Sequence, residues 1–315
     1  MATAPACPDN IRARASSRRL ELAIAWAVFV ALAYLPNLAP ERSVGLVGLM
    51  IFWSFFSMTL IILCDQITIV LQHGSLLQQA TASGKAWLSF LGVGALSGLL
   101  LDGIAQWLGK LWIYPYWNEA VYAATFVVGF CAYWLATAES YLAVRAILGR
   151  NHHPPVPSAT RPYEAVLFRA LGILGAVLTV SGIILLVYDY QSSGGYVFDT
   201  RTVLPVKNHF SYFFITFAGV WLVLEWVQFA RGRLSLLRTI LNGNRLPLYA
   251  LLLASAVFAL FWETVNAAHH FWIYTNWPFP HLQIMDIPVA VLLTWPLQYV
   301  VFLSLGFLIG RDLWA

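Results

Sequence analysis

The 315-residue sequence predicts an all-α integral membrane protein with eight transmembrane helices, arranged as two tandem parallel four-helix repeats. The composition is the first reason: 60% of the residues are apolar and 10% are charged, whereas a soluble domain carries roughly 25% charged residues. The second is a series of apolar tracts of about 20 residues, which is enough to cross a hydrocarbon core of roughly 30 Å. The third is an internal match between the two halves of the chain.

The expected spans cover residues 20–38, 44–70, 86–112, 120–148, 165–190, 209–230, 247–273 and 288–309. The first could instead be a signal peptide, because basic residues precede it and Ala31-Leu32-Ala33 resembles a cleavage site. Its apolar stretch is long for that purpose, and its removal would break the repeat. We therefore expect a basic tail at 1–19, a first repeat at 20–148, a linker at 149–164 and a second repeat at 165–311.

The lysines and arginines fall unequally on the two sides of this arrangement. Fourteen lie on the side of the N-terminal tail: Arg12, Arg14, Arg18, Arg19, Lys85, Arg145, Arg150, Arg161, Arg169, Arg231, Arg233, Arg238, Arg245 and Arg311. The other side receives four: Arg42, Lys110, Arg201 and Lys207. Because basic loops stay in the cytoplasm, we expect both termini to be cytoplasmic in a bacterial inner membrane.

Residues of the first half match residues of the second half at one constant spacing along the sequence. Four aromatic and aliphatic residues of the first copy meet identical residues of the second: Trp112, Ile113, Tyr114 and Trp117 meet Trp272, Ile273, Tyr274 and Trp277. At the same offset Asp65 meets Glu225, and Lys85 meets Arg245. Repeats in membrane proteins commonly meet at an interface that forms a site, so we expect a site between the halves.

Five acids lie within the apolar tracts: Asp65, Asp102, Glu139, Glu225 and Glu263. An ionisable group inside a bilayer is costly and therefore a candidate for function. Asp102 and Glu263 occupy equivalent helices, each about 24 Å from the cytoplasmic end at about 1.5 Å per residue. We expect these two as catalytic acids with Glu139 assisting. The alternative is a structural role, because such groups also hold helices together by hydrogen bonds. We favour this structural role for Asp65 and Glu225, which lie near the cytoplasmic end of their helices.

Each of the two central acids begins a polar stripe on one helical face. The stripes are Asp102, Gln106 and Lys110 in the first half, and Glu263, Asn266 and His270 in the second. Both end beside a Trp-x-Tyr copy, so we expect substrate contacts from the stripes and from Trp112, Tyr114, Trp272 and Tyr274. The alternative for these aromatics is a belt at the membrane surface.

Other kinds of chemistry lack support in the sequence. The three cysteines are scattered, and the histidines near the outer face (His209, His269, His270 and His281) do not form the boxes of a di-iron enzyme or a zinc site. We expect no metal and no cofactor. There is no P-loop, no Asp-rich diphosphate motif and no nucleophile elbow. The basic residues lie in loops beside apolar tracts and indicate which side of the membrane each loop faces. We therefore expect no nucleic-acid partner.

Two stretches carry a family resemblance. "WETVN" (262–266) followed by "WIYTNWP" (272–278) resembles a family of uncharacterised polytopic bacterial membrane proteins, for which no activity is implied. A looser similarity is to membrane lycopene cyclases, which also use apolar helices and intramembrane acids. Those proteins have a Pro-x-Glu-Glu motif and three-helix repeats, which this chain lacks.

The expected function is an enzyme that performs acid–base chemistry on a hydrophobic isoprenoid or membrane lipid between the two repeats. A proton-coupled transporter is the first alternative, because repeats with intramembrane acids are also typical of carriers. The second alternative is a non-catalytic subunit of a larger membrane complex, because aromatic residues are abundant and no specific catalytic motif is present. The expected partners are a membrane lipid or isoprenoid, and assembly into a homo-oligomer or a larger membrane complex stays open.

Overall fold

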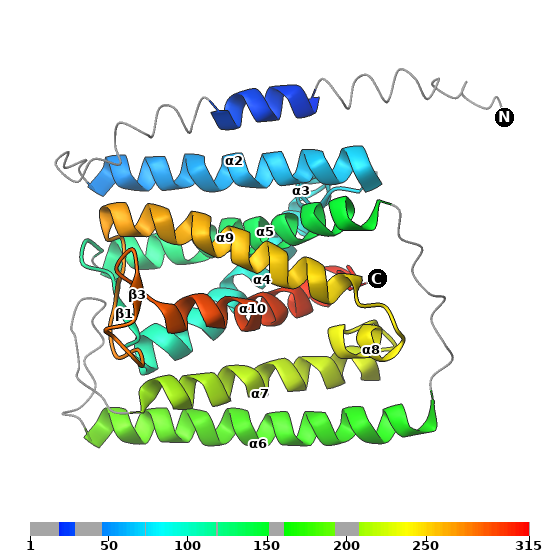
Figure 1. Cartoon of the computed structure of the whole chain (residues 1–315), viewed down its shortest axis with the longest axis vertical. Helices are drawn as coiled ribbons and strands as arrows, with labels where there is room; N and C mark the ends of the chain where they lie inside the picture. The colour runs from blue at the N-terminus through cyan, green and yellow to red at the C-terminus, as the bar shows by residue number, and fades with distance from the viewer. Residues whose placement is uncertain are drawn as a thin grey trace.

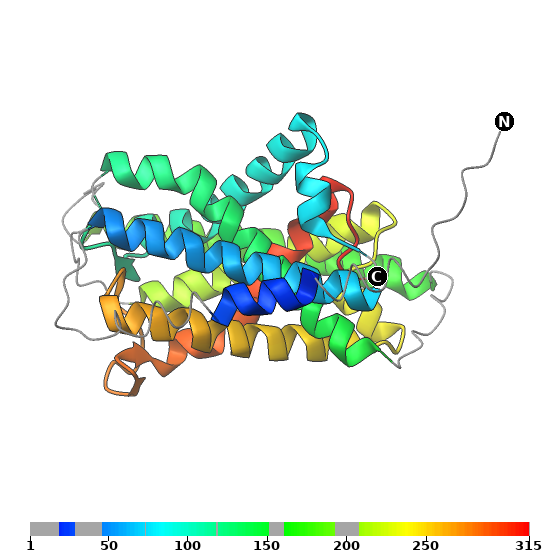
Figure 2. The same ribbon diagram turned by 90° about the horizontal axis from the view of Figure 1, so that it is seen from above.

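The protein is a bundle of long helices that run along one direction (Figure 1). The computed structural model describes residues 19–28, 46–72, 74–117, 119–150, 161–192 and 208–314. In the view turned by 90° the long helices still share this direction (Figure 2). Residues 1–18 of the expected basic tail, residues 29–38 of the expected first span and most of the expected linker lie outside the described residues.

The long helices are α2 (Leu46–Gln72), α4 (Gly84–Gly98), α5 (Glu119–Gly149), α6 (Pro162–Ser192), α7 (His209–Ala230), α9 (Leu246–His269) and α10 (Val289–Ser304). Residues 19–28 form a further helical stretch. The helix α4 continues without a break into a wider π-helical segment, η2 (Leu99–Leu108), and α10 continues into a 3-10 turn, η3 (Leu305–Ile309).

Five segments in the described part of the chain are long and apolar enough to cross a membrane: Gly84–Leu108, Pro162–Ser192, His209–Ala230, Leu246–Ala267 and Val289–Ile309. Many large apolar side chains remain exposed along them, Val166 (71%) and Leu293 (75%) among them. Contiguous apolar surface of this extent is unfavourable in water, and hydrocarbon covers it without cost. The chain is a polytopic membrane protein.

Two of these helices end earlier than the sequence suggests, and this corrects the expected spans 86–112 and 247–273. Lys110 (φ 47°) and His270 (φ 52°) adopt left-handed backbone conformations, which stop the helices. The Trp-Ile-Tyr copies that follow are therefore extended, as β1 (Trp112–Ile113) and β2 (Ile273–Tyr274). They pair in antiparallel register, with Trp112 opposite Tyr274 and Ile113 opposite Ile273.

Two short helices were not expected. These are α3 (Leu76–Thr81) and α8 (Leu236–Leu241), which occupy equivalent positions in the two halves and are each capped by a serine, Ser75 or Ser235. Each serine accepts a hydrogen bond from a backbone N–H of the first turn, which satisfies a donor at the helix start. Both lie at the opposite end of the bundle from β1 and the hairpin of β3 (Gln283–Ile284) and β4 (Ile287–Pro288) (Figure 1).

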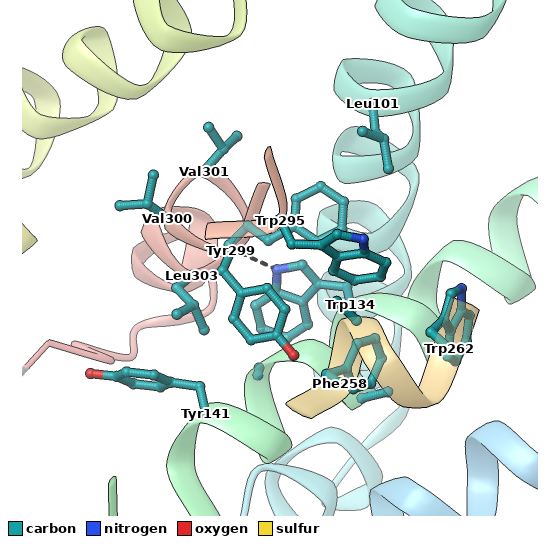
Figure 3. Close-up of a cluster of buried hydrophobic side chains, with 14 of the residues drawn as sticks. Leu101, Trp134, Tyr141, Phe258, Trp262, Trp295, Tyr299, Val300, Val301 and Leu303 are labelled. Atoms are coloured by element: carbon teal, nitrogen blue, oxygen red, sulfur yellow. Dashed lines mark hydrogen bonds between the residues drawn. The ribbon is translucent and has the colours of Figure 1, made fainter. Parts of the chain in front are cut away.

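The centre of the bundle joins the first half of the chain to the second. Trp134 of α5 is fully buried and donates its indole N–H to the carbonyl of Phe302 at 2.8 Å. Around it gather Phe258 of α9 and the α10 residues Trp295 and Tyr299 (Figure 3). The Tyr299 hydroxyl also contacts the hydroxyl of Ser140 at 2.8 Å. These contacts tie helix α5 of the first half to α9 and α10 of the second.

Candidate functional site

A cavity of about 550 Å³ lies between the halves of the chain. Its wall takes Asp102 from η2 and Glu263 from α9, so one acid from each half faces the same space. The helices α2, α5, α7 and α10 and both Trp-Ile-Tyr copies complete it. The volume is within the range of small-molecule sites.

Asp102 is held by two tyrosines. Tyr114 and Tyr122 each donate a phenolic O–H to its Oδ2, at 2.7 and 2.8 Å. The indole of Trp112 donates in turn to the Tyr114 oxygen at 3.1 Å, so the Tyr114 proton is directed at the carboxyl group. Asp102 is 1% exposed. Both hydrogen bonds reach the same oxygen, Oδ2, so the two tyrosines fix the orientation of the carboxyl group.

Glu263 is held by the equivalent tyrosine of the second half. Tyr274 donates its O–H to Glu263 Oε1 at 2.5 Å, and the indole of Trp272 hydrogen-bonds to Tyr274. The other oxygen, Oε2, is buried and accepts no well-formed hydrogen bond from the described residues, although Trp295 and Asn266 lie close to the carboxyl group. Glu263 therefore has one anchored oxygen and one oxygen without a strong donor.

The two Trp-x-Tyr copies therefore make the same chain of hydrogen bonds. In each, the tryptophan donates to a tyrosine, and the tyrosine donates to the acid of its own half. Burial, with the adjacent carboxyl group, raises the pKa of Tyr114 and of Tyr274 well above the usual value, so both phenols keep their protons. The signature holds the acids in place, which a membrane-surface belt alone does not explain.

Tyr133 and Gln298 are cavity residues that the sequence did not reveal. Gln298 of α10 donates its amide N–H to the Tyr133 oxygen at 2.5 Å, and the Tyr133 hydroxyl has no hydrogen-bond acceptor among the described residues. Tyr133 is close enough to Asp102 and Glu263 to interact electrostatically with both carboxyl groups. It comes from α5, which lies outside the stretches that match between the two halves, so the repeat could not indicate it. Tyr122 also belongs to α5, and the sequence did not indicate its role for the same reason.

The rest of the polar stripes lie outside the cavity wall. Gln106 and Asn266 are buried, and Asn266 accepts the backbone N–H of Trp272 at 3.0 Å, which fixes the turn after α9. The backbone oxygen of Lys110 accepts hydrogen bonds from Thr275 (2.6 Å) and Asn276 (2.9 Å). Lys110 and the exposed His270 are the left-handed helix ends. These contacts hold the turns at the end of the bundle, and substrate binding by the stripes stays a prediction.

Glu139 is not brought to the cavity. Its Oε1 accepts the backbone N–H groups of Leu76 and Leu77 at 3.1 and 3.2 Å, at the start of α3. Asp65 accepts the Ser75 hydroxyl at 2.5 Å in the same place. The first half thus uses two acids to hold its short helix.

Glu225 holds the equivalent helix α8. It accepts the backbone N–H of Leu237 at 3.2 Å and the indole N–H of Trp221 at 2.9 Å. Glu225 and Asp65 are both at most 1% exposed. Their contacts agree with the structural role that their position suggests.

The remainder of the cavity wall is mainly aromatic. Fifteen of the described residues in the wall are Phe, Trp or Tyr, and none is Lys, Arg or His. Besides the two acids and the tyrosines, its polar side chains are Ser57, Thr294 and Gln298. Met58 of α2 and Val128 of α5 belong to the wall and are also 49% and 61% exposed, so part of the wall reaches the lipid-facing surface.

Comparison with known proteins gives no family assignment. No protein-family model, curated protein or solved structure matches this chain. Function is therefore inferred from the fold and from the cavity.

Proposed function

We propose that the protein is a membrane enzyme that performs acid–base chemistry on an isoprenoid or lipid molecule held between the two halves of the chain. The observation that carries this proposal is that Asp102 and Glu263, buried and equivalently placed, line one apolar cavity. Two carboxyl groups that face one ligand can act as proton donor and proton acceptor in the same reaction.

The surroundings of the two acids favour different roles. Two phenol donors stabilise the anion of Asp102, which suits the group that accepts a proton. Glu263 has one such donor and a buried second oxygen, which suits the group that donates a proton. Tyr133, whose hydroxyl has no acceptor in the described part of the chain, would donate to the substrate and orient it between them.

The substrate would enter from the bilayer. Met58 and Val128 belong both to the cavity wall and to the exposed apolar surface of the bundle. A molecule dissolved in the lipid phase can reach the acids past these side chains without crossing water. This path supports a hydrophobic substrate over a water-soluble one.

The proposed architecture is eight spans in two parallel four-helix repeats, with both termini in the cytoplasm of a bacterial inner membrane. Helices α2 and α5, with 27 and 31 residues, are long enough to span at about 1.5 Å per residue. The equivalent positions of α3 and α8 and the paired Trp-Ile-Tyr copies support the repeat. The excess of Lys and Arg on one side supports the orientation.

The test is a comparison of total lipid extracts from membranes that contain the wild type or the double variant Asp102→Asn with Glu263→Gln. Asp65→Asn is the matched control, because Asp65 is an equally buried acid outside the cavity. We expect a lipid species that only the wild type and the control produce. Identical extracts at equal expression would overturn the proposal.

A proton-coupled carrier is the second candidate. It is favoured by the position of the acids on equivalent helices of the two halves, since sites of repeat transporters lie at such interfaces. It predicts pH-dependent flux of the ligand in proteoliposomes, abolished by the same double variant. The absence of flux under any proton gradient would exclude it.

A further inference from the structure

We infer that the natural ligand of the cavity is an amphiphile with a positively charged ammonium group. This inference deepens the proposed function and rests on its claim that the cavity holds the substrate. It is carried by the combination of two acids, a mainly aromatic wall and the lack of any Lys, Arg or His among the described residues of that wall.

The charges of the wall all have one sign. Among the described residues of the wall, Asp102 and Glu263 are the ionisable groups that can carry a charge at neutral pH, and both are 1% exposed. A buried carboxylate is costly unless an opposite charge accompanies it. The tyrosines that hold the two acids are neutral donors and supply no such charge. An ammonium ion in the cavity would offset that cost, whereas a phosphate or carboxylate head group would meet only like charge. The wall therefore favours a cation and opposes the anionic head groups of common membrane lipids.

The aromatic rings supply the second part of the recognition. Near Asp102, Tyr114 stacks on Trp117 with ring centres 4.7 Å apart. Along α5 the aromatic wall continues with Tyr122, Phe126 and Phe130, whose successive ring centres are 5.7 and 5.0 Å apart. The faces of aromatic rings attract cations, most strongly where water is excluded.

A second aromatic group accompanies Glu263. Tyr133 and Trp262 have ring centres 4.9 Å apart, and Trp295 lies 6.4 Å from Tyr133. Each acid thus stands beside its own set of rings, and a quaternary or tertiary ammonium is the group that such a set of rings and acids recognises. The apolar remainder of the wall would contact an alkyl chain.

The experiment measures binding of radiolabelled dodecyltrimethylammonium to the purified full-length protein in a non-ionic detergent, below the micelle concentration of the ammonium. Unlabelled dodecyltrimethylammonium competes in one series. Its uncharged carbon isostere, 2,2-dimethyltetradecane, competes in the other. We expect saturable binding and displacement at least about tenfold better by the cation, from the strength of cation–ring contacts.

Three variants locate the bound probe. Asp102→Asn with Glu263→Gln is expected to lose the preference for the cation, and Trp262→Leu is expected to weaken binding of the probe. Asp65→Asn is expected to bind as the wild type does. Equal displacement by the isostere, or charge-selective binding that survives neutralisation of both cavity acids, would overturn the inference.

Failure of this inference and failure of the proposed function give different results. A lipid product that depends on Asp102 and Glu263, together with no preference for the charged probe, refutes the ammonium ligand and leaves the enzyme. Charge-selective binding without any product supports the ammonium ligand and moves the function to transport. A lysophosphatidic acid that displaces the probe as well as the ammonium does would also overturn the inference, because the wall should repel it.

Discussion

At the scale of single residues, the Trp-x-Tyr signature matters through its hydroxyl groups. Tyr114 and Tyr274 come from different halves of the chain and donate to acids of the same cavity. The sequence predicted that both copies of the signature lie at the site, and it paired Asp102 with Glu263. It could not show that the tyrosines hold the acids, because the contact depends on how the chain turns back after Lys110 and His270.

Substitution of Tyr274 by phenylalanine removes the donor to Glu263 and leaves Oε1 unpaired. We expect a loss of about 1 to 3 kcal/mol of stability, the usual cost of a hydrogen bond to a charged or buried group. A lower apparent Tm of the purified protein would report it. Tyr116→Phe is the control, because Tyr116 is 45% exposed and should change the Tm little. Equal melting of the two variants would contradict the hydrogen bond.

Ser235 gives a second prediction at this scale. Its side chain caps α8, so Ser235→Ala should destabilise the protein by about 1 to 2 kcal/mol. Ser89→Ala is the control, because the exposed Ser89 hydroxyl only donates to the Lys85 carbonyl within α4. A comparison of the midpoints of thermal unfolding decides the matter, and a control that melts as early as Ser235→Ala would refute the cap.

At the scale of elements, apolar tracts predicted where the long helices run but not how they end. Left-handed residues stop η2 and α9 before the expected boundaries, and a lysine or a histidine does not signal this conformation. The short helices α3 and α8 were also missed, although "SLL" occurs in both copies. In the sequence, the stretch around each capping serine is typical of a loop. The short helix becomes apparent only when the buried acids that bind its first turn are known.

The contact between α6 and α7 depends on small residues. A Cβ atom at Gly219 would stand 2.6 Å from the Thr179 backbone nitrogen and 2.7 Å from the Gly175 oxygen. Gly219→Val should therefore force the helices apart and lower the apparent Tm, because close backbone approach holds membrane helices together. Gly92→Ala, at a helical position with nothing within 4 Å, should melt no earlier than the wild type. A Gly219→Val protein as stable as Gly92→Ala would contradict the packing.

At the scale of the whole molecule, β1 and β2 join the halves at one end of the bundle. The composition predicted a membrane protein and the offset predicted equivalent helices, but neither predicted that the two copies would pair with each other. Pairing follows because both copies leave their helices at the same end of the bundle, where extended segments must satisfy their backbone groups.

This pairing can be tested by cross-linking. Ile113→Cys and Ile273→Cys lie directly opposite each other, at a Cα separation of about 4.5 to 5.5 Å for paired strands, which suits a disulfide. With Cys7, Cys64 and Cys131 replaced by serine, mild oxidation should cross-link one chain and change its mobility on a gel. The pair Ile113→Cys with Leu293→Cys should not react, because Leu293 belongs to α10, outside the β1–β2 pairing, and is 75% exposed. Equal reaction of both pairs would contradict the register.

Our main proposal is that Asp102 and Glu263 face one cavity that holds a hydrophobic or amphiphilic molecule. The most direct measurement is mass spectrometry of an organic extract of the purified protein, compared with extracts of Asp102→Asn with Glu263→Gln and of Asp65→Asn. We predict one hydrophobic or amphiphilic species, in a one-to-one ratio with the protein, that is present with the wild type and Asp65→Asn and is lost from the double variant. Bulk phospholipid alone in all three extracts would contradict the claim.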